Sequence, residues 1–298
     1  MLRRSLLLPL VLGPVALSSM ALFPGKNCLA APARAGTAPL RVVTSFSVLA
    51  DMVRQLAGNN ATVDSLVGPG GDVHEYEPHP SDLEKLARAD VVVVNGLGLD
   101  RWMNRLIQAS GTKAPVIVAG AAVIPRQLPG GITDPHAWQN PQNGILYVKA
   151  IAAGLAPFGM ALNTEAYIAQ IRALDQWCAQ QFATIPAARR RIVTSHDAFG
   201  YYAARYGLQI MPVRGVENAE PSAQEFAALA TRLRAAHGEV VFLENLTNPA
   251  LLQSLAAETG ARVGGTLYAD SLSPPDGPAA NYLAMIRYNT QTIVTALR

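Results

Sequence analysis

Residues 191–197 read Arg-Ile-Val-Thr-Ser-His-Asp, and this stretch decides the fold. A run rich in β-branched residues ends at His196 and is followed by the aromatic turn Phe199-Gly200-Tyr201-Tyr202. Continuous apolar runs are typical of buried parallel strands, so we expect a strand over 191–195. Ligands bind beyond the carboxyl ends of strands in open α/β sheets. His196 therefore lies where such a protein would place a binding group.

An internal repeat begins 150 positions earlier, where residues 41–46 read Arg-Val-Val-Thr-Ser-Phe. This segment matches 191–196 nearly residue for residue, with phenylalanine in place of histidine. Two further pairs of segments echo each other in the same order, 77–78 with 220–221 and 90–95 with 239–245. Three echoes in one order predict two similar lobes.

The first 35 residues are expected to be a secretory signal. Arg3 and Arg4 precede a largely apolar stretch from Leu6 to Leu22, and Ala33-Arg34-Ala35 offers a small-residue cleavage site. Proline and glycine interrupt the apolar stretch, which is also short for a membrane span. We therefore expect export to the periplasm.

Cys28 raises the question of a lipid anchor. The residues before it are Gly25-Lys26-Asn27, which are not the small apolar residues that such processing needs. Soluble export without a lipid anchor is therefore the prediction. Cys178 is the only cysteine after the signal, so we expect no internal disulfide and a buried packing role for this thiol.

The basic balance of the chain belongs to its signal. Four of the 24 basic residues and none of the 21 acidic residues lie in positions 1–35, which leaves the mature chain with a net charge of −1. Nothing in this balance indicates binding to nucleic acid.

Strand and helix signals alternate through the rest of the chain. Strands are expected at 40–46, 61–67, 91–94 and 116–119 in the first lobe, and at 191–195, 208–213, 239–244 and 262–267 in the second. Ser81–Glu84 and Ser222–Glu225 match the capping box that begins a helix. The alternation predicts an α/β fold in which each lobe is a mostly parallel sheet flanked by helices. A chain of 298 residues, half of them hydrophobic, is long enough for two such domains.

Residues 163–182 predict one long amphipathic helix, which Asn163 or Thr164 can cap and which Pro186 follows. Its apolar stripe comprises Tyr167, Ile171, Leu174, Cys178 and Phe182. About 20 residues at ~1.5 Å each span ~30 Å, enough to join two lobes. We therefore divide the chain into a signal at 1–35, a first lobe at 36–162, a linking helix at 163–186 and a second lobe at 187–298.

His74, His136 and His196 are the candidate metal ligands among the five histidines. Each is expected at the junction between a strand and the helix that follows. Asp72 and Asp134 lie two positions before His74 and His136, where each could order the loop or orient the imidazole. A single loop histidine is usually a solvated turn residue, but three at such junctions favour a common site.

A closed site needs a fourth ligand, and the residues alone leave its identity open. Asp270 follows the last predicted strand, but its spacing fits a turn or N-cap aspartate equally well. His79 lies in an exposed-looking Pro-His-Pro turn, and His237 lies at a helix end, where a histidine suits the helix dipole. Neither of these two histidines is expected to bind the metal.

Four motifs together are distinctive: 72–78 with Ser81-Asp82, 134–138, 195–201, and 267–272 running into 274–277. With them the chain resembles the periplasmic solute-binding proteins of zinc and manganese ABC transporters, over nearly all of its mature length. The resemblance implies two α/β lobes joined by one rigid helix, with the ion held between the lobes and with modest lobe movement. It also implies the ligands, which are His74 and His136 from the first lobe and His196 and Asp270 from the second.

The ligand set favours zinc as the transported ion. Three imidazoles and one carboxylate suit zinc and disfavour calcium or magnesium, and equilibrium affinity favours zinc over manganese. Relatives associated with manganese usually carry a carboxylate where this chain has His196. Many zinc-binding relatives, however, have a loop rich in histidine and acidic residues, whereas residues 120–133 contain neither. Manganese is therefore the alternative.

The expected function is capture of the ion and its delivery to a membrane ABC permease. Protons should compete with the metal, so affinity should fall on acidification. We expect a monomer, name a periplasmic metallochaperone as a second candidate partner, and expect no nucleic acid.

Two other classes of protein compete with this interpretation. A zinc hydrolase also uses three protein ligands, but it needs an open fourth position and a nearby base. His74-Glu75 begins like a metalloprotease helix and then lacks the second histidine, so we expect no enzyme. The second competitor is an adhesin stabilised by its metal, and ready exchange of the ion would argue against it.

Overall fold

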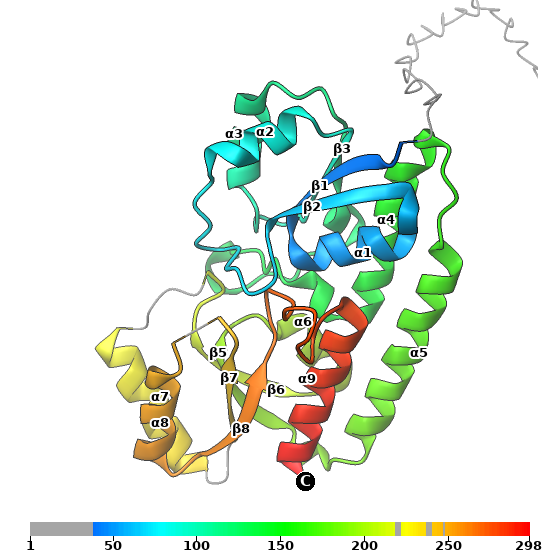
Figure 1. Ribbon diagram of the computed structural model, residues 1–298. Helices are drawn as coiled ribbons and strands as arrows, with labels where there is room; N and C mark the ends of the chain where they lie inside the picture. The colour runs from blue at the N-terminus through cyan, green and yellow to red at the C-terminus, as the bar shows by residue number, and fades with distance from the viewer. Residues whose placement is uncertain (1–37, 218–221, 237–239, 247) are drawn as a thin grey trace, which may run out of the picture. The chain divides into compact units, whose positions relative to one another are not determined.

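Two four-stranded parallel sheets form the framework of the protein (Figure 1). The computed structural model describes residues 38–217, 222–236, 240–246 and 248–298, so the predicted signal, Glu220-Pro221 and His237 lie outside the described residues. The first sheet has the order β2-β1-β3-β4, and the second has the order β6-β5-β7-β8. The strands are β1 (Leu40–Phe46), β2 (Ala61–Val67), β3 (Val91–Val94), β4 (Val116–Val118), β5 (Arg191–His196), β6 (Gln209–Arg214), β7 (Val240–Glu244) and β8 (Arg262–Leu267).

Helices connect and cover these strands. Around the first sheet they are α1 (Ser47–Ala57), α2 (Pro80–Ala87), α3 (Trp102–Ser110) and α4 (Pro141–Leu155). The long α5 (Thr164–Ala183) leads to the second sheet, which is followed or flanked by α6 (Gly200–Tyr206), α7 (Ala223–Ala236), α8 (Ala250–Thr259) and α9 (Tyr282–Leu297). The predicted fold class is confirmed, since each lobe is a parallel sheet flanked by helices. In the part of the chain that is described, no helix combines the length and the apolar character needed to cross a membrane.

The internal repeat corresponds to equivalent strands. β1 pairs with β2 and β3, and β5 pairs in the same way with β6 and β7. The registers also match, since Val42 lies opposite Val91 and Ile192 lies opposite Val240. The predicted likeness of the two lobes is therefore confirmed in their topology.

Helix α5 is the predicted linking helix, and every residue of its predicted apolar stripe is buried. Helix α9 packs against both α5 and β8, which places the end of the chain beside the link (Figure 1). Cys178 is a buried free thiol, as expected, with its Sγ 3.2 Å from the hydroxyl of Thr290 on α9.

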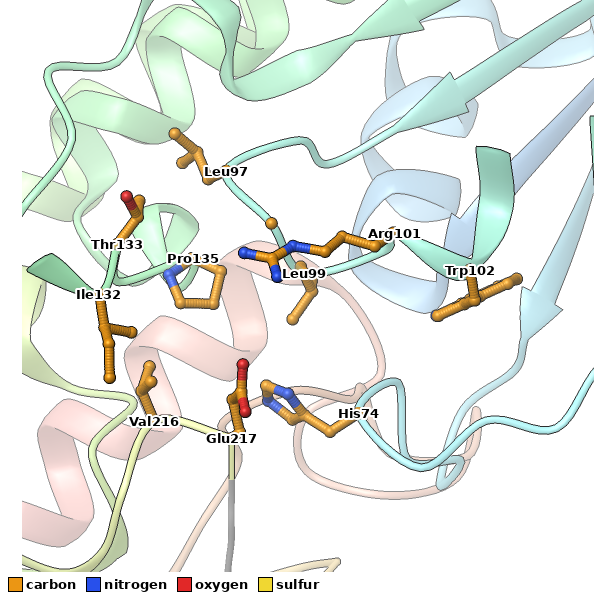
Figure 2. Close-up of a pocket in the computed structure, with 11 residues that line it drawn as sticks. His74, Leu97, Leu99, Arg101, Trp102, Ile132, Thr133, Pro135, Val216 and Glu217 are labelled. Atoms are coloured by element: carbon orange, nitrogen blue, oxygen red, sulfur yellow. The ribbon is translucent and has the colours of Figure 1, made fainter. Parts of the chain in front are cut away.

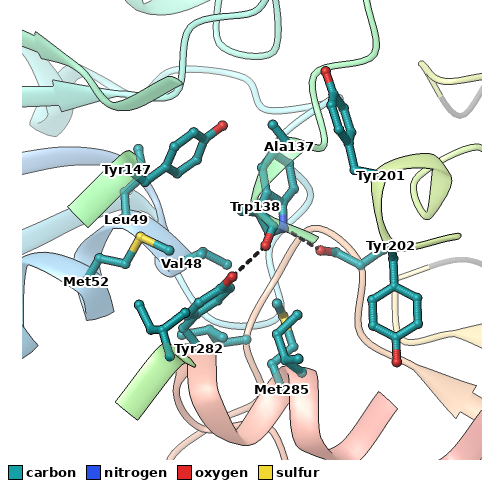
Figure 3. Close-up of a cluster of buried hydrophobic side chains, with 14 of the residues drawn as sticks. Val48, Leu49, Met52, Ala137, Trp138, Tyr147, Tyr201, Tyr202, Tyr282 and Met285 are labelled. Carbon is teal, nitrogen blue, oxygen red and sulfur yellow. Dashed lines mark hydrogen bonds between the residues drawn. The ribbon is translucent and has the colours of Figure 1, made fainter. Parts of the chain in front are cut away.

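One hydrophobic cluster contains buried side chains from both lobes, while two smaller clusters lie within the individual lobes. Trp138 and Tyr282 lie in the shared cluster, where the hydroxyl of Tyr282 donates to the carbonyl of Trp138 at 2.7 Å (Figure 3). The backbone N–H of Tyr282, at the start of α9, donates to Asp51 of α1 at 2.8 Å. The start of α9 is thus fixed to the first lobe.

One predicted helix cap is confirmed and one is wrong. At α7 the backbone N–H of Ser222 donates to Glu225, and the N–H of Glu225 donates back to the Ser222 hydroxyl. At α2 the helix begins at Pro80, one residue before Ser81, and the cap is the Asp82 carboxylate, which accepts the N–H of His79 at 2.8 Å. Proline is favoured at the first helical position, because the backbone N–H that it lacks would have no partner within the helix there. His79 itself is exposed, as expected.

Candidate metal centre

The structure brings His74, His136, His196 and Asp270 together. Each offers one ligand atom, and these atoms all lie within 4.8 Å of one another. His74 lies in the loop after β2, His196 ends β5, and Asp270 follows β8. His136 immediately precedes the short 3-10 helix Ala137–Gln139. Residues separated by almost 200 positions therefore meet at one point.

The Nε2 atoms of the three imidazoles face the Asp270 carboxylate. They lie 3.0 Å (His196), 3.3 Å (His136) and 3.6 Å (His74) from its oxygens, and the Nε2 atoms of His74 and His136 are 3.2 Å apart. Although both are buried, His196 Nε2 and Asp270 Oδ1 make no well-aligned hydrogen bond to any described residue. Such unmatched buried atoms are costly unless another group binds them. A cation that accepts nitrogen and oxygen ligands fits this arrangement.

Asp134 orients the ring of His136. Its Oδ1 lies 2.9 Å from His136 Nδ1 and also accepts the backbone N–H of His136 at 3.0 Å. This contact holds the proton on Nδ1 and leaves Nε2 with its lone pair toward the site. Asp72 makes the equivalent backbone contact, because it accepts the N–H of His74 at 2.8 Å and so orders the loop. Asp134 therefore takes both of the roles considered for these aspartates, whereas Asp72 takes the loop-ordering role.

Glu244 supports His196 in the same manner, and the sequence analysis missed this residue. Its Oε2 lies 2.5 Å from His196 Nδ1, and its Oε1 accepts the backbone N–H of His196 at 3.1 Å. Glu244 ends β7, which pairs with β5. In the order β6-β5-β7-β8 the neighbours β5 and β7 form the topological switch point, where α/β proteins bind ligands. The signal available in the sequence was the position of Glu244 at the end of segment 239–245, which echoes segment 90–95.

The chain around Asp270 is attached to the first lobe, although β8 belongs to the second. The carbonyl of Ala269 accepts the indole N–H of Trp138 at 3.1 Å, and the carbonyl of Leu272 accepts the N–H of Gly70 at 3.1 Å. Gly70 has a φ of +76°, which suits glycine in the tight turn that leads to His74. Asp270 is therefore positioned by contacts with the loops that carry His74 and His136.

Charge is arranged to keep Asp270 ionised. Burial alone would raise its pKa, but His196 and His136 outweigh burial and hold the pKa of Asp270 well below its usual range. Burial lowers the pKa of His196, but Glu244 and Asp270 together raise it well above the usual value. The metal-free centre therefore favours a proton on His196, and an arriving cation must displace it.

A cavity of about 350 Å³ is lined by His74, the one residue of the four that it touches. Figure 2 shows His74 at this cavity together with Arg101, Trp102 and Glu217. The side chain of His74 is 7% exposed, while those of His136, His196 and Asp270 are between 0 and 4% exposed. His74 is thus the most accessible of the four residues.

Residues 42–296 match the model of the family described as ZnuA, zinc-uptake complex component A, periplasmic. The iron-binding protein YfeA of Yersinia pestis is 34% identical over 265 residues, which cover 85% of each chain. The manganese-binding lipoprotein MntA of Halalkalibacterium halodurans is 31% identical over 266 residues, which cover 87% of this chain and 88% of MntA. These relatives are metal-binding proteins rather than enzymes.

Solved structures agree with the sequence relatives. The periplasmic zinc-binding protein TroA of Treponema pallidum superposes with a TM-score of 0.81 and is 28% identical, covering 87% of this chain and 99% of TroA. The manganese-bound periplasmic metal-binding protein of Candidatus Liberibacter asiaticus gives a TM-score of 0.77 at 26% identity, covering 87% of this chain and 100% of that structure. The fold, the buried histidine–aspartate centre and these matches show that the chain belongs to the ZnuA family of periplasmic metal-binding components of ABC transporters.

Proposed function

We propose that the chain binds one divalent transition-metal ion through His74, His136, His196 and Asp270 and delivers it to its permease. The observation that carries this proposal is the convergence of four ligand atoms at a buried point with unmatched polar atoms. As a member of this family the chain is the substrate-binding component of a metal ABC transporter, which implies a membrane permease as partner. We propose in addition that it acts as a monomer and can exchange metal with a periplasmic metallochaperone.

Zinc is the ion that we propose, on the chemistry of the ligands. Three imidazoles with one carboxylate form the four-coordinate nitrogen and oxygen set that zinc favours. Manganese is the second candidate, because MntA is named for manganese and the Liberibacter protein has a manganese-bound structure. YfeA is named for iron, so the names of relatives do not favour one metal.

The placement of Asp270 supports transport over catalysis. Its carboxylate lies beside all three imidazoles, where a zinc hydrolase needs a water molecule. The cavity at His74 supports exchange of the ion, which an adhesin that uses its metal only for stability does not need.

We also propose that residues 1–35 direct export and that the mature chain is divided at 36–162, 163–186 and 187–298. Soluble export remains our prediction, although relatives such as MntA are named lipoproteins. Cys28, the candidate anchor, lies outside the described residues.

The function is tested by competitive binding of zinc and manganese to the demetallated mature chain. The test variants are Asp270→Ala and His196→Ala, and the matched controls are Asp276→Ala and His79→Ala, since both control side chains are exposed. One-to-one zinc binding, weakened only in the test variants, is the expected result. Competition by manganese at equal concentration would favour the manganese alternative, and unchanged binding in both test variants would contradict the ligand assignment.

A further inference from the structure

Arg126 lies in the first lobe, in the loop between β4 and His136. Its Nη1 is 2.8 Å from Oδ2 of Asp134, the oxygen that does not hold His136. The same Nη1 is 3.6 Å from Oδ1 of Asp197, which follows His196 in the second lobe. One guanidinium therefore lies between the carboxylate that orients His136 and a carboxylate next to His196.

A second contact joins the lobes at the same place. The backbone N–H of Arg126 donates to the hydroxyl of Tyr201 at 2.7 Å, and that hydroxyl donates to the carbonyl of Asp134 at 3.1 Å. Tyr201 belongs to α6 in the second lobe and is 7% exposed. A buried hydroxyl that both accepts and donates is fully satisfied, so this bridge fixes the geometry of the loop.

Gly200 provides the space that the guanidinium occupies. A Cβ added to Gly200 would lie 2.1 Å from Arg126 Nη1, far closer than two such atoms can approach. Gly200 is the first residue of α6 and its φ is not in the left-handed region, so the backbone itself does not require glycine. The glycine therefore serves the placement of Arg126.

We propose that Arg126 is a positioning residue that fixes the orientation of His136 and closes the two lobes over the bound ion. This role rests on the proposed function, in which His136 and His196 are ligands. Asp134 is fully buried, so loss of Arg126 leaves one of its oxygens without its charged partner and frees the carboxylate to turn. The contact to the second lobe is lost at the same time. Both effects speed the release of the ion.

The test follows the rate at which the zinc-loaded mature chain releases zinc to an excess of chelator. Arg126→Gln should release zinc about 10- to 100-fold faster, the range for loss of a group that orients a metal ligand. Arg126→Lys should release zinc at a rate between those of the wild type and Arg126→Gln, since an ammonium keeps the charge but loses the planar set of donors. The control is Arg88→Gln at the C-terminal end of α2, where the side chains of Arg88 and its ion-pair partner Glu84 are 66% and 72% exposed.

Gly200→Ala separates positioning from stability. The higher helix propensity of alanine offsets only part of the cost of displacing the Arg126 guanidinium from Asp134, so the metal-free variant should lose less thermal stability than Arg126→Gln. Because the new methyl group displaces the guanidinium, zinc release should nevertheless accelerate.

Release from both Arg126→Gln and Gly200→Ala within twofold of the wild type would overturn the inference. Faster release in proportion to the loss of thermal stability across these variants would overturn it as well, since a structural role explains that pattern. If the wild type binds no zinc or manganese, the proposed function fails first and this inference falls with it.

Discussion

Asp175 lies at the middle of the linking helix α5 and joins helices of both lobes. Its carboxylate accepts hydrogen bonds from Gln142 of α4 at 2.6 Å and from Tyr206 of α6 at 2.9 Å. It also accepts two from Arg205 of α6, at 2.8 Å from Nε and 2.6 Å from Nη2. We predict that Asp175→Ala destabilises the metal-free protein through this junction.

The magnitude follows from the exposure of each partner. The Tyr206 residue is 4% exposed, so the loss of its acceptor costs about 1–3 kcal/mol. The side chain of Arg205 is 38% exposed and regains water, so its ion pair contributes about 1 kcal/mol or less. The expected total is about 3 kcal/mol, or a decrease of roughly 5–6 °C in Tm for a chain of this size. Asp175→Asn should cost less, because an amide oxygen still accepts from Tyr206.

The effect should depend on pH with a definite sign. Burial raises the pKa of Asp175, but hydrogen bonds from Arg205, Gln142 and Tyr206 outweigh burial and leave the pKa below the usual value of an aspartate. A carboxyl group whose pKa is lowered on folding stabilises the protein above its unfolded pKa, about 3.9, and loses this contribution as pH falls through the folded pKa. The difference between the wild type and Asp175→Asn should be complete at pH 7 and should shrink below about pH 4.

Thermal and urea unfolding of the metal-free protein at pH 7 and at pH 3.5 measures both effects. The control is Glu165→Ala, an exposed acidic residue in the first turn of the same helix. The reasoning is refuted if Asp175→Ala unfolds within about 0.5 kcal/mol of the wild type at pH 7, the usual range of a neutral surface substitution.

Three further predictions concern the metal and the export of the chain. Glu244→Gln should weaken zinc binding about 10- to 100-fold, measured by calorimetry, because the 2.5 Å contact that orients His196 loses its charge. The control is Glu258→Gln, since Glu258 is exposed, and an affinity equal to that of the wild type would refute the role of Glu244. Apparent zinc affinity should fall from pH 7.5 to pH 5.5, since the raised pKa of His196 means that protons occupy the metal-free centre, and a flat profile would contradict this order of events. On cell fractionation the wild type and Cys28→Ala should both be soluble in the periplasm, and membrane retention that Cys28→Ala abolishes would show a lipid anchor instead.

Much of the fold could be predicted because its signals are local. The β-branched run at 191–195 and its echo at 41–46 are both strands, and both occupy central positions of their sheets. The apolar stripe on the linking helix could be predicted from spacing alone. The role of Asp175 could not, because it depends on the contact with Arg205 of α6, which lies 30 positions further along the chain. The predicted start of α2 was wrong by one residue, because the predicted capping box Ser81–Glu84 overlaps the capping box of His79 and Asp82 that the structure shows.

The candidate site was partly predictable for the same reason. His74, His136 and His196 stand out because histidine is rare in this chain and each lies at a junction. The contacts that attach Asp270 to the first lobe could not be predicted, because they join residues 131 or more positions apart. Glu244 needed the pairing of β7 with β5, which spacing along the sequence does not give.

Anomalous diffraction at the zinc edge from crystals of the zinc-loaded chain tests the central claim most directly. The account predicts one strong peak bonded to Nε2 of His74, His136 and His196 at about 2.0–2.1 Å and to an Asp270 oxygen at about 2.0–2.2 Å. A peak elsewhere, or a zinc ion held by the three imidazoles with water in place of Asp270, would contradict it.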